Sequence, residues 1–545
     1  MSVVQGKTEP MMRYDQEYLS IPNVVRRAAA QYGDAPALVD GATRWSFREL
    51  DRQMTRAVRA ALALGVSPGD RVGICAPNRA EWIVAALAVQ GAGGIVVPLN
   101  TRFKAAELAY ILRKSGAKAL FAAPFLDTDY VAELRKHEPE LSALHTTVSL
   151  TAERGDADYS WNDFLGEGSR AGDEDAARAS IDRITPDTVS DIMFTSGTTG
   201  HPKGVVLTHG QSLRAYGWMA EQYTFRTGDV FLVVPPFFHC FGYKAGWLAS
   251  FLHGVTVVPM AMFDPALALE LIERERVSIM LGPPTIFQDL LAAPDRDRRD
   301  TSSLRISMTG GTTIPEQLIH AMKDELSFDI VMSAYGLTEA SALVTTTRLG
   351  DTPATVARGN GRRIPDVDVR IADDAGKPVP VGGTGEIQVR GYTVTSGYWD
   401  EPEATAAAIG DDGWLRTGDI GSLDDEGNLA VVDRKKDMFI VGGFNAYPAE
   451  IERLLLGYGP VAEAAVIGVP DQRLGEVGCA YLVLRPGETT TAADVIAWSR
   501  ANMANFKVPR DVRFVDQLPR NASRKVLKHE LRAAFTGPAS QGGDA

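Results

Sequence analysis

Residues 194–205, FTSGTTGHPKGV, combine the residue types that hold a chain of phosphates. Glycines let the backbone turn tightly and bring its N–H groups close to an anion. Hydroxyls donate hydrogen bonds to phosphate oxygens, and a lysine ammonium adds a positive charge. We therefore predict a polyphosphate-binding loop, with the candidate ligands Thr195, Ser196, Gly197, Thr198, Thr199, Gly200 and Lys203.

This loop differs from a Walker loop, in which the lysine is followed by serine or threonine at the start of a helix. Here Lys203 is followed by Gly204, and apolar runs at 191–193 and 205–207 flank the loop. Such runs predict a strand on each side. The alternative interpretation is a surface loop that is rich in glycine and threonine and binds nothing.

Residues 334–339, AYGLTE, form a second candidate site. Tyr335 offers an aromatic face on which a base can stack. The hydroxyl of Thr338 and the carboxylate of Glu339 suit a phosphate and its magnesium ion. The alternative is a turn with a helix N-cap at Thr338.

Two single residues complete the candidates. Asp419 follows a glycine, and a carboxylate at such a turn can accept two hydrogen bonds from ribose hydroxyls. Taken alone, the same pattern is more typical of a plain turn at the end of a strand. The second is His239, in the segment 236–246, PFFHCFGYKAG, which is a candidate for a functional histidine. The alternative is a structural histidine at the edge of the core.

The elements that must position these residues are of the α/β kind. Apolar periodicity predicts helices at 22–33 and 47–64, and short buried strands at 71–75 and 94–98. The alternation of such strands with helices implies parallel sheets. Turn residues at 372–385, followed by a strand at 386–389, predict a small β-rich subdomain. We expect the polar segment 152–184 to be a surface excursion, and the tail 537–545 to be disordered.

Composition narrows the class of protein. A chain of 545 residues predicts roughly three or four domain-sized units. Its net charge of −13 argues against nucleic acid or anionic lipid as a partner. The three cysteines are far apart, show no zinc pattern, and suggest a reduced, cytoplasmic location. We find no signal peptide, and the most apolar stretch, 82–98, is too interrupted to span a membrane.

Together with the segments 433–437, 442–448 and 518–525, these motifs resemble the adenylate-forming superfamily, which includes acyl-CoA synthetases, luciferase and nonribosomal adenylation domains. The resemblance covers about residues 20–535, with the motifs in the same order. It implies a large N-terminal domain, 1–435, made of parallel sheets with a β-rich subdomain, which holds the acid and ATP or AMP. It also implies a small mobile α+β C-terminal domain, 436–545.

The resemblance also implies roles for single residues. Tyr335 matches a tyrosine that stacks on adenine, Glu339 the carboxylate that binds Mg²⁺, and Asp419 the ribose-binding aspartate. His239 matches a position beside the carboxylate of the acid. Further matches in the nucleotide site are Gly310, Gly311, Thr312, Gly336, Thr338 and Arg434.

Three matches concern the C-terminal domain. Lys436 lies at the pivot about which the domain turns, and Gly443 at the tunnel for the pantetheine of coenzyme A. Lys525 matches the lysine that contacts the reacting carboxylate and the α-phosphate. The implied reaction uses ATP to form an acyl-adenylate and pyrophosphate. The domain then turns, and the CoA thiol displaces AMP.

Arg524 departs from the family pattern, in which glycine usually precedes the lysine. A side chain there costs about 1–2 kcal/mol if φ must be positive. We therefore hypothesise that adenylation is impaired, whereas CoA transfer from an adenylate made by a separate adenylating enzyme is spared. The alternative is that Arg524 points to solvent and changes nothing.

The sequences at 264–265, 282–286 and 468–477 resemble those of actinobacterial ligases for steroid-ring breakdown acids. It implies a bulky alicyclic acid, steroid- or terpenoid-derived, as the substrate. The alternatives are a medium- or long-chain fatty acyl-CoA ligase, an enzyme that loads a carrier protein, and a binding protein that has lost turnover.

Overall fold

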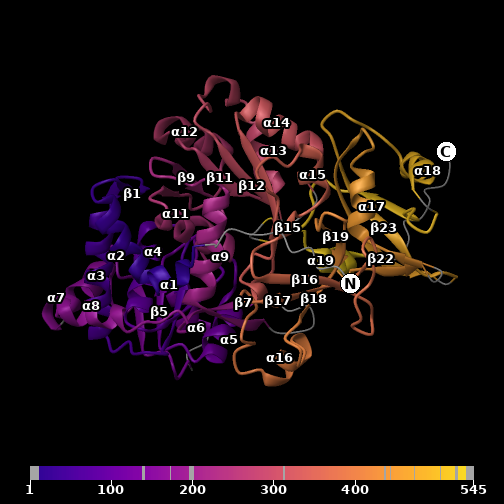
Figure 1. The fold of residues 1–545 in the computed structure, drawn as a ribbon. Coiled ribbons are helices and arrows are strands. Elements are labelled where there is room, and N and C mark those ends of the chain that lie inside the picture. Colours follow the sequence, from indigo (N-terminus) through magenta and orange to yellow (C-terminus); the bar gives the residue numbers. More distant parts are fainter. Residues whose placement is uncertain are drawn as a thin grey trace.

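The computed structural model describes residues 12–137, 141–171, 173–195, 202–310, 314–434, 437–441, 444–471, 473–503, 505–521, 524 and 526–535. The chain forms a large N-terminal domain with a smaller C-terminal domain beside it, drawn in orange to yellow in Figure 1. The C-terminal domain lies next to α13 (Pro284–Ala292), α14 (Glu316–Leu326) and α15 (Pro353–Arg358).

In the first sheet, the predicted phosphate loop connects the last two strands, β7 and β8. In the described residues its strand order is β6-β5-β3-β4-β7-β8. Pairing is parallel from β6 to β7 and antiparallel between β7 and β8. The strands are β3 (Arg71–Cys75), β4 (Ile95–Pro98), β5 (Ala119–Ala122), β6 (Thr146–Ser149), β7 (Val189–Thr195) and β8 (Lys203–Thr208).

The second sheet is mostly parallel, and it combines β1 and β2, which precede the first sheet in the chain, with strands that follow it. Its strand order in the described residues is β15-β14-β13-β12-β11-β9-β10-β1-β2, with antiparallel pairs at both edges. The strands are β1 (Pro36–Asp40), β2 (Thr43–Ser46), β9 (Val230–Val233), β10 (Thr256–Pro259), β11 (Ile279–Gly282), β12 (Ile306–Gly310), β13 (Ile330–Tyr335), β14 (Thr345–Thr346) and β15 (Arg362–Arg363). The prediction of parallel sheets is confirmed.

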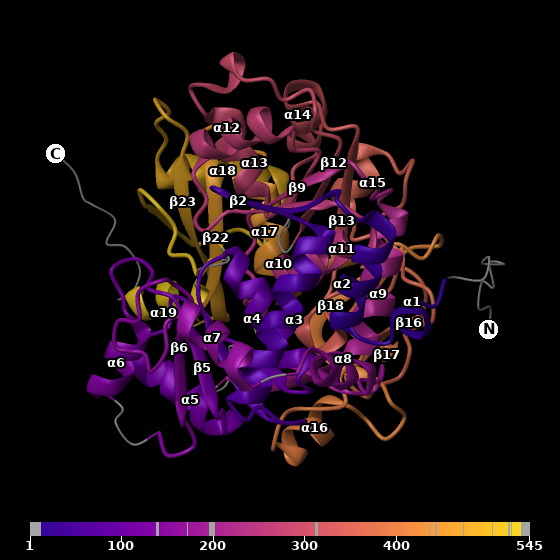
Figure 2. The ribbon, with the colours of Figure 1, turned by 90° about the vertical axis from the view of Figure 1, so that its left-hand side faces the viewer.

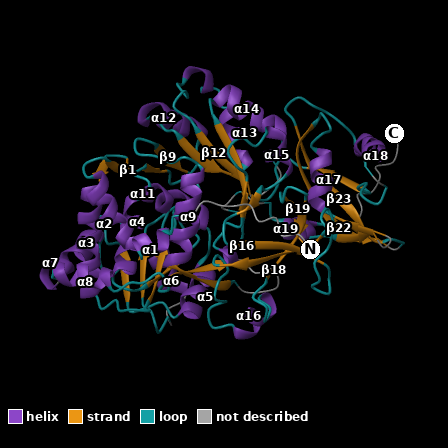
Figure 3. Ribbon diagram, in the orientation of Figure 1, coloured by secondary structure: helices purple, strands orange, loops and turns teal. Residues whose placement is uncertain are grey.

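Helices surround both sheets, as Figure 3 shows in purple. They are α1 (Tyr14–Tyr18), α2 (Ile21–Tyr32), α3 (Phe47–Ala63), α4 (Ala80–Gly91), α5 (Ala105–Ser115), α6 (Tyr130–His137), α7 (Trp161–Ala171), α8 (Glu174–Asp182), α9 (His209–Gln222), α10 (Cys240–Gly242), α11 (Ala249–Leu252) and α12 (Pro265–Glu275). A π-helix, η1 (Tyr243–Leu248), and two 3-10 turns, η2 (Arg296–Arg298) and η3 (Thr338–Ala340), complete this group.

The local signals explain where these helices begin and end. The hydroxyl of Ser46 accepts a hydrogen bond from the Glu49 N–H and caps α3. The chain leaves this helix at Gly65, whose φ of +84° favours glycine. The predicted helix at 47–64 is therefore confirmed.

The prediction for 152–184 is wrong. This segment contains α7 and α8, which pack on α3. The few apolar side chains of the segment face inward, because Phe164 and Ile181 are fully buried in the main core. The polar residues between them cover the outer faces of the helices, and they dominate the composition.

The predicted β-rich subdomain is confirmed. It is a fully antiparallel sheet in the order β16-β17-β18-β19. Its strands are β16 (Val367–Ala372), β17 (Gly385–Gly391), β18 (Leu415–Leu423) and β19 (Leu429–Arg434), and α16 (Pro402–Ala408) lies between β17 and β18 in the chain.

The C-terminal domain has its own α+β core. Its sheet has the order β21-β20-β23-β22, with β24 parallel to β23. Its elements are β20 (Phe439–Val441), β21 (Phe444–Ala446), α17 (Pro448–Leu455), β22 (Val461–Asp471), β23 (Gly475–Leu484), α18 (Ala492–Asn502), β24 (Asp511–Phe514) and α19 (Lys528–Ala534). Figure 2 shows β22 and β23 behind the N-terminal domain. The boundary predicted at 435/436 falls outside the described residues, as does the tail 537–545.

Among the helices that the structure describes, none combines the length and the apolar character needed to cross a membrane.

Candidate functional site

The predicted phosphate loop joins the two strands of a hairpin. Thr195 ends β7 and Lys203 begins β8, and the two residues are partners in the antiparallel register. The other candidate ligands, Ser196, Gly197, Thr198, Thr199 and Gly200, lie outside the described residues. β7 is parallel to β4, so the loop lies at the carboxyl edge of the first sheet.

The nucleotide candidates of the second sheet lie at its carboxyl edge. Gly310 ends β12 and pairs in register with Ala334, next to Tyr335 at the end of β13. A Cβ on Gly336 would lie 2.2 Å from the Ala342 carbonyl carbon, so only glycine fits there. Gly311 and Thr312 lie outside the described residues.

Tyr335 and Asp419 are brought together from different sheets. The Tyr335 hydroxyl donates a hydrogen bond of 2.7 Å to Asp419 Oδ2. Asp419 lies in β18, is 3% exposed and is paired in register with Arg434 at the end of β19. The three residues, predicted separately from the sequence, are therefore close neighbours.

Glu339 and Lys203 are linked through Tyr398, which the sequence prediction missed. The Tyr398 hydroxyl donates a hydrogen bond of 3.0 Å to Glu339 Oε1. The Lys203 ammonium lies 5.0 Å from the centre of the same ring. Thr338 and Glu339 begin the 3-10 turn η3, separated by two residues from Tyr335, which ends β13. A tyrosine in the sequence SGYWD carries no signal of chemistry, because only the fold brings it to the loop.

His239 lies at the N-terminus of α10. It caps α10, and its Nδ1 accepts a hydrogen bond of 3.2 Å from the Phe241 N–H. Its side chain reaches solvent, yet the surrounding protein desolvates the ring and lowers its pKa. Such a histidine is neutral at pH 7.

A buried ion pair involves β7, the strand that leads into the phosphate loop. Lys244 Nζ lies 3.0 Å from Asp191 Oδ1, and both side chains are fully buried. Lys244 belongs to the π-helix η1 and Asp191 to β7, so the pair ties the segment of His239 to the strand that leads into the loop. Removing one partner of such a pair leaves an uncompensated buried charge. In the sequence, the signal for this pair is that Asp191 and Lys244 are charged residues within largely apolar segments.

The residues present fit a magnesium ion that is held mainly by its substrate. In the described part of the chain, no group of three or more His, Cys, Asp or Glu side chains could hold a metal. Mg²⁺ commonly takes one or two carboxylates together with phosphate oxygens and waters. The half-buried Glu339 carboxylate, which contacts the same Tyr398 side chain as the phosphate-loop lysine, meets that requirement.

Arg524 joins the two domains. Its guanidinium forms an ion pair with Asp289 of α13 and lies 5.5 Å from the ring centre of Phe263. Its φ is +62°, in the left-handed region that favours glycine. The side chain is 40% exposed and also contacts the N-terminal domain. Lys525, Lys436 and Gly443 lie outside the described residues.

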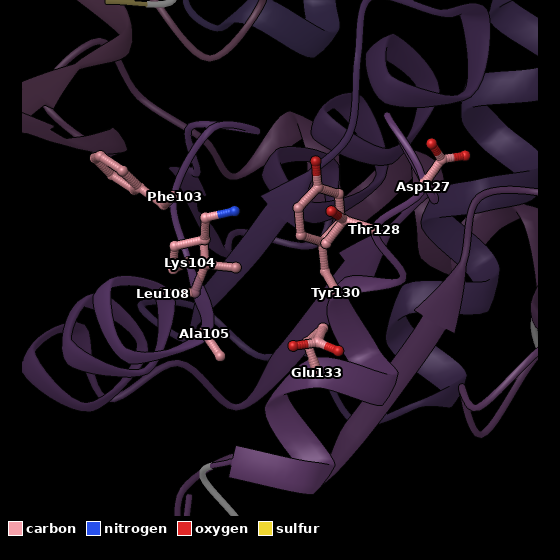
Figure 4. A pocket seen from close by; sticks show the side chains of 8 residues that line it. All are labelled: Phe103, Lys104, Ala105, Leu108, Asp127, Thr128, Tyr130 and Glu133. Carbon is pink, nitrogen blue, oxygen red and sulfur yellow. The ribbon is translucent and has the colours of Figure 1, made fainter.

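A small pocket lies away from these residues, at the start of α5 and α6. Figure 4 shows Lys104, Tyr130 and Glu133 around it, and its volume is about 90 Å³. Sites for small organic ligands usually measure about 300–1,000 Å³. This pocket is therefore too small for the predicted acid.

Comparison with known proteins agrees with the fold and with the motifs. The model of the AMP-binding enzyme family matches residues 25–399, and that of the AMP-binding enzyme C-terminal domain matches residues 450–525. The chain therefore belongs to the AMP-binding enzyme family, and its recognition as an AMP-forming acyl-CoA synthetase of the adenylate-forming superfamily is confirmed.

Similar curated proteins are CoA ligases. A (methyl-dioxo-octahydro-indenyl)propanoyl:CoA ligase of Mycobacterium tuberculosis is 49% identical, over 94% of this chain and 98% of that protein. A ligase of the same description from Rhodococcus jostii is 47% identical, with the same coverage. The solved anthranilate CoA ligase in complex with anthranoyl-AMP is 26% identical, with a TM-score of 0.85 over 96% of this chain and 99% of that one.

Proposed function

We propose that this acyl-CoA synthetase converts a bulky alicyclic carboxylic acid, steroid- or terpenoid-derived, into its CoA thioester through an acyl-adenylate. The observation that carries the proposal is the identity of 49% and 47% to two ligases whose named acyl group is a fused-ring propanoyl. We also propose that the protein acts in the cytoplasm.

In the adenylation half-reaction, the carboxylate of the acid attacks the α-phosphorus of ATP and pyrophosphate leaves. Tyr335 would offer its ring to adenine and Asp419 its carboxylate to the ribose hydroxyls. Lys203 and the loop before it would hold the phosphates, and Glu339 would hold magnesium. Magnesium, when bound, neutralises charge on the phosphates. Lys525 would stabilise the charge that develops between acid and α-phosphate.

In the second half-reaction, the CoA thiol attacks the adenylate carbonyl and AMP leaves. The C-terminal domain would turn about Lys436, withdraw Lys525 and bring Gly443 to the pantetheine path. Neutral His239, beside the carbonyl, would position the acyl group without adding a charge. The nucleotide contacts of Tyr335 and Asp419 would serve both steps, because both residues belong to the N-terminal domain.

We propose further that Arg524 slows adenylation. A non-glycine residue at φ +62° costs about 1–2 kcal/mol. The ion pair with Asp289 offsets part of this, but the two side chains are 40% and 41% exposed, and such pairs contribute about 0–1 kcal/mol. On balance this orientation of the loop is disfavoured relative to one with glycine. CoA transfer would be spared, and a separate adenylating enzyme would supply the adenylate.

The test is a panel of acids in which pyrophosphate release and thioester formation are measured separately. The panel pairs fused-ring propanoic acids with linear fatty acids of equal carbon number, and offers free CoA or a carrier protein. We expect thioester only with free CoA, and faster with the fused-ring acids. A preference for linear acids would contradict the proposed substrate class. Loading of the carrier protein would contradict CoA as the acyl acceptor.

A further inference from the structure

We propose that Tyr398 is a positioning residue for the binding of ATP with its magnesium ion. Its hydroxyl holds the carboxylate of Glu339, and its ring holds the ammonium of Lys203. This inference rests on the proposed function, because it takes Glu339 as the magnesium carboxylate and Lys203 as a phosphate ligand.

The backbone of Tyr398 is fixed to the strand that leaves the phosphate loop. Tyr398 forms a bridge with Val205 of β8. On either side, the Trp399 N–H donates to the Gly204 carbonyl at 2.7 Å, and the Val206 N–H donates to the Gly397 carbonyl at 3.1 Å. The backbone of the tyrosine is therefore tied to β8, the strand that begins with Lys203.

Glu339 is tied to the same segment by its backbone. Its carbonyl accepts a hydrogen bond of 2.8 Å from the Thr395 N–H. The Thr395 hydroxyl in turn donates to the Val206 carbonyl at 2.6 Å. Three chain segments that are far apart in sequence are thus locked together, and Tyr398 adds the link between their functional side chains.

The two contacts of Tyr398 need different parts of the side chain. Burial, and then the charge of Glu339, raise the pKa of the Tyr398 hydroxyl, so the hydroxyl keeps its proton at pH 7 and donates to the carboxylate. The face of the ring attracts the ammonium by a cation–π interaction. Replacing the hydroxyl and replacing the ring are therefore separable experiments.

The arrangement also keeps two opposite charges apart. Among the residues that the structure describes, Lys203 and Glu339 form no ion pair with each other. Each instead contacts Tyr398. A direct pair would occupy the lysine and the carboxylate that phosphate and magnesium require. Tyr398 thus presents both groups to the ligand without letting them neutralise each other.

The experiment measures ATP affinity by calorimetry with and without Mg²⁺, which does not depend on the rate of adenylation. Tyr398→Phe removes only the hydroxyl, and Tyr398→Leu removes the ring as well. Tyr392→Phe is the matched control, because the buried Tyr392 hydroxyl has no hydrogen-bond partner among the described residues and the ring contacts Arg214. Glu339→Gln tests the proposed magnesium carboxylate.

We expect Tyr398→Phe to reduce the gain in ATP affinity due to Mg²⁺ by roughly tenfold. AMP affinity should stay within about twofold of wild type, and Tyr398→Leu should also weaken ATP binding without Mg²⁺. If Glu339→Gln loses the Mg²⁺ effect while Tyr398→Phe keeps it, the role of Tyr398 is overturned. If wild type shows no Mg²⁺ effect, or Glu339→Gln keeps it, the magnesium assignment itself is overturned, and the role of Tyr398 with it.

Discussion

The carboxylate of Asp419 is held in place by a hydrogen bond from another residue of the protein. The Tyr335 hydroxyl donates to one of its carboxylate oxygens at 2.7 Å, and the side chain is almost wholly buried. A buried carboxylate that is held in this way loses little freedom when it accepts further hydrogen bonds from a ligand. We interpret the pair as a pre-formed ribose site.

We predict that Asp419→Ala lowers AMP affinity by at least about 100-fold, because two charge-assisted hydrogen bonds are lost. Calorimetric titration with AMP measures this. Tyr335→Phe, which keeps the ring and the carboxylate, should have a smaller effect. An affinity in Asp419→Ala equal to that of wild type would refute the ribose role.

At the residue scale, the sequence predicts groups that carry their own chemistry and misses those that act through a neighbour. Tyr335, Asp419 and Glu339 were predicted because an aromatic ring or a carboxylate lies in or near a glycine-containing motif. Tyr398 was missed because its role depends on a bridge to β8 that no local pattern encodes. Lys244 and Asp191 lie more than 50 residues apart in the chain, and only the fold brings them together as an ion pair.

At the scale of elements, strong apolar periodicity predicted helices correctly, whereas the polar composition of a segment hid two of them. The helix at 47–64 was predicted with its cap because Ser46 and Gly65 mark its ends. The helices α7 and α8 were missed because their apolar stripes are narrow and their polar faces dominate the segment. Packing on α3 stabilises them, and that packing is not visible locally.

The junction of α9 with α2 depends on a neutral histidine. His209 begins α9, is 1% exposed, and accepts a hydrogen bond of 3.2 Å from the Ile21 N–H through Nδ1. Burial, and then the nearby charge of Lys244, lower the pKa of His209 to about 3. In the unfolded chain its pKa is about 6.5.

We predict a loss of stability in acid from this histidine. Below about pH 6.5 the unfolded chain binds a proton that the folded protein does not, so the free energy of unfolding falls as pH drops toward 3, by about 1 kcal/mol per pH unit. His209→Asn keeps an acceptor but cannot titrate, and its thermal midpoint should fall less between pH 7 and pH 5. The exposed His320→Asn serves as the control. An equal fall in His209→Asn and wild type would contradict this prediction.

At the scale of the whole molecule, the contact of Arg524 with Asp289 and Phe263 is a direct side-chain link between the two domains. The sequence identified Arg524 as a departure from the family pattern. It could not identify the partners, because they lie in α13 and just before α12, more than 200 residues earlier. Which side chains meet across a domain interface is set by the docked arrangement and not by any local pattern.

We predict that Arg524→Gly raises ATP–pyrophosphate exchange with the true acid by about tenfold or more, because strain of about 1–2 kcal/mol is relieved. Thioester formation from a supplied adenylate should not change. Asp289→Ala keeps the strained residue but removes its ion pair, and should not increase exchange. Brisk exchange by wild type, or no gain in the glycine variant, would defeat the proposal.

The most direct test of the central claim supplies the intermediate. Purified protein is mixed with CoA and the synthetic adenylate of a fused-ring propanoic acid, in parallel with the adenylate of a linear acid of equal carbon number, and the products are identified by mass spectrometry. We predict fused-ring acyl-CoA and AMP in equal amounts, formed faster than the linear thioester. Absence of any thioester across a broad set of adenylates would contradict the assignment as a CoA ligase.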